Sequence, residues 1–76
     1  MNDTLQQDQR TIEGTLANDE YSSDTEVLEL LMEECPGFDQ ALIARIIREQ
    51  RPIFYLEPLH IIDWSYYDLP NGIWNN

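Results

Sequence analysis

The stretch SSDTEVLELLMEECPGFDQALIARIIREQRP, residues 22–52, decides the fold that this chain is expected to adopt. Ser23 followed three residues later by Glu26 is a capping box, in which each side chain bonds the other residue's backbone N–H at the start of a helix. A helix is therefore predicted over residues 24–34, ending at Cys35-Pro36-Gly37. Its apolar face contains Val27, Leu28, Leu31 and Met32.

A second helix is predicted over residues 39–51 of the same stretch. Asp39 suits the position before its first turn, and Phe38 is placed to pack on Ile43 as a hydrophobic staple. Its buried stripe consists of Leu42, Ile43, Ile46 and Ile47. Arg51 and Pro52 end the helix, because proline disfavours a helix interior. The short connection between the two helices predicts that they pack as a hairpin.

Residues 1–21 are expected to form a flexible acidic segment. Leu5, Ile12 and Leu16 are isolated in a polar background and bury too little surface to offset the entropy of ordering. Their spacings of seven and four permit a transient helix that folds on binding, although Gly14 opposes a stable one.

Residues 53–68 are read as a third helix over about 58–68, with a strand as the alternative. Pro58 is disfavoured within a central strand and suits the first turn of a helix. Leu59, Ile62 and Tyr66 would then face the hairpin. The expected architecture is a mainly α domain over 22–70, followed by a tail over 71–76 after a turn at Pro70-Asn71-Gly72.

The charge of the chain bears on its partners. Fifteen acids oppose four arginines in 76 residues, which gives a net charge of −11. This field repels nucleic acid and attracts a basic protein surface, so no direct nucleic-acid or membrane partner is expected. No secretory or membrane-spanning segment is recognised, and a cytoplasmic location is predicted. The sequence leaves open whether the protein also forms a homodimer.

Catalytic residues are not expected. Cys35 lies at the C-terminal end of a predicted helix, where the helix dipole disfavours a thiolate nucleophile, so an inert buried cysteine is the better interpretation. His60 with Asp63 is read as structural or solvated. One cysteine and one histidine make no metal site, and no cofactor motif occurs. The alternative is an enzyme subunit that contributes a residue such as His60 to a composite site.

Candidate partner-binding residues are acidic and aromatic. Glu26, Glu29 and Glu33 place carboxylates in steps of about 5–6 Å along one helix face, beside Glu34. Tyr67 and Trp74 are expected to be exposed binding anchors, and Phe54 and Trp64 to be core residues. The arginines Arg45, Arg48 and Arg51 are expected to pair with carboxylates of the first predicted helix or of a partner.

These features predict a small acidic protein, not an enzyme, that binds and inhibits a larger, basic nucleic-acid-handling protein. Such an inhibitor would be of phage or plasmid type, and its glutamate row would partly imitate nucleic acid. The alternative is a helical adaptor or assembly factor that binds a partner helix or a ubiquitin-like domain.

The stretch LLMEECPGFDQALIARIIRE, residues 30–49, resembles the first two helices of small three-helix ubiquitin-binding modules. Those modules carry an aromatic residue close after the methionine that ends their first helix, whereas Met32 is followed by Glu33-Glu34-Cys35-Pro36. The region after Pro52 also lacks their di-leucine ending. The resemblance implies a helical hairpin and does not assign the chain to that family.

Overall fold

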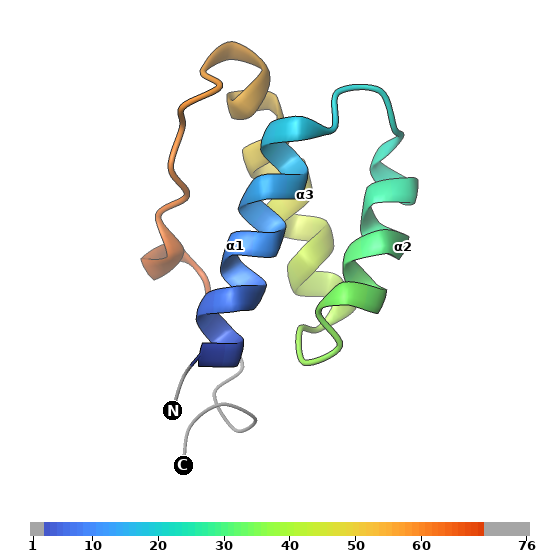
Figure 1. Cartoon of the computed structure of the whole chain (residues 1–76), viewed down its shortest axis with the longest axis vertical. Helices are drawn as coiled ribbons and strands as arrows, with labels where there is room; N and C mark the ends of the chain where they lie inside the picture. The colour runs from blue at the N-terminus through green and yellow to red at the C-terminus, as the bar shows by residue number, and fades with distance from the viewer. Residues whose placement is uncertain (1–2, 70–76) are drawn as a thin grey trace.

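Three α-helices form an up-down-up bundle in the computed structural model, which describes residues 3–69 (Figure 1). Helix α1 spans Asp3–Asn18, α2 spans Asp24–Glu34 and α3 spans Gln40–Leu56, and a 3-10 helix η1 follows at Trp64–Tyr66. Each pair of α-helices is in contact, and no strand occurs within this described range. The predicted small, mainly helical fold is therefore confirmed.

The hairpin of α2 and α3 agrees with its sequence signals. Ser23 N–H donates to Glu26 Oε1 at 2.8 Å, and Glu26 N–H donates to Ser23 Oγ at 3.2 Å, which completes the capping box. Asp39 occupies the N-cap position of α3, but its side chain makes no capping bond there. Phe38 and Ile43 are both buried, as the staple requires.

Helix α3 is longer than predicted, because it continues through Pro52 to Leu56. Proline inside a helix removes one backbone hydrogen bond and costs about 3 kcal/mol. The extra turn buries Phe54 in the core and ends in a bond from Glu57 N–H to the Ile53 carbonyl at 2.8 Å. Burial of an aromatic side chain contributes a free energy of similar size, so tertiary packing offsets the proline.

The third helix lies at the N-terminus and not at residues 58–68. The prediction of a flexible segment over residues 1–21 is wrong for α1, whose Ile12 and Leu16 are 0% and 3% exposed. Alone, this segment has too little apolar surface to order, but the hairpin supplies an apolar surface against which Ile12 and Leu16 pack. The transient helix over Leu5–Leu16 was the correct element, and it needs no external partner.

Residues 57–69 contain no α-helix, so the predicted third helix over 58–68 is wrong. The chain turns at Glu57, runs extended, and returns alongside α1 toward the beginning of that helix (Figure 1). Trp64 Nε1 donates to Glu13 Oε2 at 3.0 Å, and Ile62 and Tyr67 enter the core. Helix α1 packs against the α2–α3 hairpin, and residues 57–69 cover a further part of the core beside α1. The predicted turn at residues 70–72 and the tail over 71–76 lie outside the described residues.

Candidate functional site

The exposed glutamates of α2 form the acidic face, defined as Glu26, Glu29, Glu33 and Glu34. All four are exposed, as the sequence predicted. The Glu26 carboxylate also closes the capping box, whereas no described side chain makes an ion pair with Glu29, Glu33 or Glu34. Charges of one sign therefore project from a single helix into solvent.

Packing and end contacts fix the position of α2. Val27 and Leu31 are 1% and 0% exposed and hold the inner side of the helix against the core. The capping box fixes its first turn, where Asp24 and Glu26 also suit the helix dipole. The acidic face is thus carried on a helix whose orientation is set by the fold.

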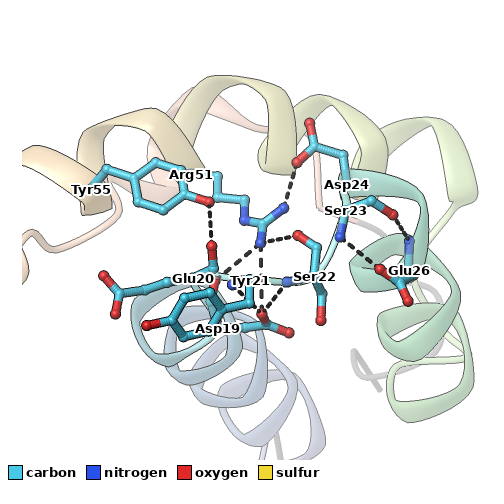
Figure 2. A network of polar contacts seen from close by, with 9 residues as sticks. All are labelled: Asp19, Glu20, Tyr21, Ser22, Ser23, Asp24, Glu26, Arg51 and Tyr55. Atoms are coloured by element: carbon cyan, nitrogen blue, oxygen red, sulfur yellow. Dashed lines mark hydrogen bonds and ion pairs between the residues drawn. The ribbon is translucent and has the colours of Figure 1, made fainter.

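Arg51 connects α3 to the linker between α1 and α2, and with Asp19, Ser22 and Asp24 it forms the Arg51 cluster (Figure 2). One guanidinium nitrogen donates to Asp24 Oδ1 at 2.6 Å, and the other donates to the backbone carbonyls of Asp19 and Ser22. The Arg51 side chain is only 4% exposed, and its Nε has no hydrogen-bond partner within residues 3–69. The expected pairing with the first predicted helix is confirmed for Arg51, although the residue is buried.

The linker makes further bonds around this cluster. Backbone N–H groups of Ser22 and Tyr21 donate to Asp19 Oδ1 at 2.9 and 3.2 Å. The bonds from Ser22, and to a smaller extent the Tyr21 N–H and the Arg51 charge, lower the pKa of Asp19. Tyr55 donates its hydroxyl to the Glu20 carbonyl at 3.2 Å (Figure 2), and the centre of its ring lies 5.8 Å from the Arg51 guanidinium carbon. These contacts set the angle at which α2 leaves α1.

The other two arginines of α3 behave differently. Arg45 and Arg48 are exposed, and Arg45 pairs with Glu49 of its own helix at 3.1 Å instead of with a carboxylate of α2. This exposed pair contributes about 0–1 kcal/mol. The arginines of α3 therefore do not form one exposed basic stripe.

Tyr67 is buried, so the prediction of an exposed tyrosine anchor is wrong. It is 6% exposed, and its hydroxyl donates to Glu49 Oε1 at 2.9 Å while accepting from Gln50 Nε2 at 2.9 Å. Burial raises the pKa of Tyr67, and the Tyr67 hydroxyl lowers the pKa of Glu49. Phe54 is a core residue as predicted, Trp64 is partly buried, and Trp74 lies outside the described residues.

Cys35 and His60 make separate contacts. The Cys35 thiol is 0% exposed and contacts the Asp8 backbone carbonyl at 3.8 Å. Burial, with the nearby charges of Asp8 and Glu34, raises the pKa of Cys35 to about 12, so the thiol stays protonated at neutral pH. His60 Nε2 lies 2.6 Å from Gln50 Oε1 and donates to it, because the Gln50 amide nitrogen is used by Tyr67. The hydrogen bonds described for Cys35 and His60 go to Asp8 and Gln50, so His60 is not seen to act as a base that activates the Cys35 thiol.

Exposed apolar side chains are a candidate binding feature that the sequence did not predict. Leu56, Leu59 and Ile61 are 85%, 93% and 79% exposed, and Tyr21 is 96% exposed. A helix over 58–68 would have turned Leu59 toward the core, so its exposure follows from the corrected fold. The signal in the sequence was Pro58 itself, which also suits a turn.

No metal-ligand cluster occurs among the described residues, and no helix there combines the length and the apolar character needed to cross a bilayer. No family model, curated protein or solved structure matches the chain.

Proposed function

We propose that this protein is a small, acidic, non-catalytic binding protein that occupies and inhibits a basic surface of a larger nucleic-acid-handling protein. The observation that carries the proposal is the acidic face, where Glu29, Glu33 and Glu34 are exposed on a fixed helix without a described ion pair. Unpaired carboxylates of one sign attract a basic surface and accelerate encounter.

The geometry of the acidic face supports a partial imitation of nucleic acid. Neighbouring carboxylates on one helix face are about 5–6 Å apart at their Cβ atoms, so one helix presents a regular row of negative charge. Lysines and arginines that bind the phosphates of a nucleic acid would bind this row of carboxylates in place of the phosphates. We place this activity in the cytoplasm, and a phage- or plasmid-type inhibitor is the kind of protein that fits it.

A helical adaptor is the second candidate function. The exposed Leu56, Leu59 and Ile61 favour it, because large apolar side chains gathered at a surface mark binding sites for partner proteins. In that function the negative charge would serve solubility, and a partner helix or a ubiquitin-like domain would be held by apolar contact.

The test is capture of binding proteins from a cell lysate with the tagged protein, washed at low and at high salt. The double variant Glu29→Gln/Glu33→Gln is compared with Asp39→Asn/Asp68→Asn, which removes the same charge from exposed positions elsewhere. We expect a nucleic-acid-binding protein to be captured and released by salt. The Glu29/Glu33 variant should weaken its binding by about 2- to 30-fold, at 0.2–1 kcal/mol for each exposed pair, whereas the control variant should capture it normally.

Equal capture by both double variants would contradict the proposal. A partner that survives high salt, is captured equally by the Glu29→Gln/Glu33→Gln and control variants, and is lost from Leu59→Ser/Ile61→Ser would establish the adaptor function in its place.

A further inference from the structure

Two shallow hollows, open to solvent, flank the outer side of α1. One, of about 600 Å³, lies between α1 and α2 and includes Tyr21 and Leu30. The other, of about 470 Å³, lies between α1 and residues 58–61 and includes Leu59 and Ile61. Arg10 and Gly14 line both hollows, so they form the ridge between them. In Figure 1 this ridge belongs to the helix nearest the viewer, with α2 on one side and the returning chain on the other.

Gly14 has no function in the fold of the free protein. Glycine in a helix interior is less favourable than alanine, because its backbone loses more conformational freedom on folding. No described glycine has a positive φ, and a Cβ added at Gly14 would meet nothing within 4 Å. An alanine would therefore fit the isolated protein better than the glycine does. A glycine in such a place is explained when the backbone of another molecule approaches closely.

The hollows are bordered by apolar side chains that the fold leaves in water. Tyr21 and Leu59 are more than nine-tenths exposed, and Ile61 is about four-fifths exposed. Leu30 on α2 is also exposed. These four residues lie in pairs on opposite sides of Gly14, an arrangement suited to the apolar face of one helix lying across α1.

The charges around the hollows determine which kind of helix fits. Leu30 lies one turn from both Glu26 and Glu34 on α2, and the Leu59–Ile61 segment lies between Glu57 and Asp63 in the sequence. Among the described residues, Arg10 is the one arginine that lines the hollows. A second copy of this chain would bring another net charge of −11 to this surface, whereas a basic helix would neutralise it.

We infer that a basic amphipathic helix of the partner protein lies across α1 at Gly14. Its apolar face covers Tyr21 and Leu30 on one side and Leu59 and Ile61 on the other, while its lysines and arginines meet the surrounding carboxylates. Helix axes normally pack 8–10 Å apart, depending on the side chains at the crossing, and glycine permits the close end of that range. This inference rests on the proposed function and assigns the secondary structure of its partner.

The test uses an amphipathic helical peptide of about 18 leucine and lysine residues, which at 1.5 Å per residue spans about 27 Å. A peptide of the same composition, scrambled to remove the apolar face, is the control ligand. Affinities are measured by calorimetry for the wild-type protein, Gly14→Ala, Gly14→Gln and Gln6→Ala, the last at an exposed α1 position outside both hollows. Thermal unfolding is measured on the same proteins.

The expected result has opposite signs in the two measurements. Gly14→Ala should raise the melting temperature by about 4–8 °C, because alanine favours a helix interior more than glycine does, yet bind the amphipathic peptide more weakly. Gly14→Gln should weaken binding about tenfold or more, and Gln6→Ala should leave it unchanged. The scrambled peptide should bind less tightly than the amphipathic one.

Wild-type affinity in both Gly14 variants, or equal affinity for the scrambled peptide, would overturn this docking site. The proposed function would survive that result if Glu29→Gln/Glu33→Gln still lowered binding, and both would fail if it did not. Self-association of the wild-type protein that Gly14→Gln abolishes would instead identify a second copy as the occupant and overturn the inference.

Discussion

Replacement of Arg51 by methionine should destabilise the whole bundle. Methionine keeps much of the buried aliphatic volume but removes the donors to Asp24 and to the carbonyls of Asp19 and Ser22. Hydrogen bonds to a charged group contribute about 1.5–3 kcal/mol each. The Asp24 side chain is 68% exposed, so water replaces the arginine there, and the loss should stay below that of a fully buried ion pair. With the Asp24 bond discounted, the two bonds to the Asp19 and Ser22 carbonyls remain, so we expect Arg51→Met to lower the free energy of unfolding by about 3–6 kcal/mol.

Urea unfolding followed by circular dichroism at neutral pH measures this change. Arg48→Met is the matched control, because Arg48 is exposed on the same helix and its loss should change stability by less than about 0.5 kcal/mol. Arg51→Lys should fall between the wild type and Arg51→Met, since a lysine keeps the charge but cannot reproduce the planar fork of donors. Equal stability of Arg51→Met and Arg48→Met would refute the assignment of Arg51 as the contact that holds the linker.

Three further outcomes are expected. The Cys35 thiol, with a pKa of about 12 and no exposure, should not react with a thiol reagent at pH 8 in the folded protein and should react at once in urea; rapid labelling of the native state would contradict its burial. Burial raises the pKa of Asp8, so ionisation of this carboxyl opposes folding, and Asp8→Asn should increase the free energy of unfolding at pH 7. The gain should shrink as the pH falls and vanish below 3.8, the ordinary pKa, where the carboxyl is protonated in the folded and unfolded states. An unchanged gain in acid would exclude this cause. Tyr67→Phe should cost about 1–3 kcal/mol in urea unfolding, because it leaves the buried Gln50 amide without its acceptor, and a neutral result would show that water replaces the hydroxyl.

The sequence predicted the elements whose signals are local. Ser23 and Glu26 lie three residues apart and mark the start of α2 without help from the rest of the chain, and the bounds of that helix agree with the prediction. The acidic face followed directly, because residues on the outside of a correctly placed amphipathic helix are exposed.

The elements that depend on tertiary contacts were not predictable in this way. Ile12 and Leu16 in α1 have the spacing of a helix but too little apolar surface for independent order, so their state depends on the hairpin against which they pack. Tertiary packing also stabilises α3 beyond Pro52, where the helix continues to Leu56. With α1 packed against the hairpin, residues 57–69 form an extended return with the short 3-10 helix η1 in place of a third packed helix, and in this arrangement Leu59 is exposed and Tyr67 is buried.

The Arg51 cluster has a consequence for the order in which the chain assembles. Its acceptors precede the arginine by 27 to 32 residues, so these bonds cannot form until α3 has docked. Bonds of such long sequence separation form late, after the loop between them has been closed. During synthesis, the residues of α1 and α2 are complete well before Arg51 is made. Until then, the linker between these helices lacks its hydrogen bonds to Arg51. A chain truncated before residue 51 would therefore keep the signals for α2 and lose the contact that sets α2 at its angle to α1.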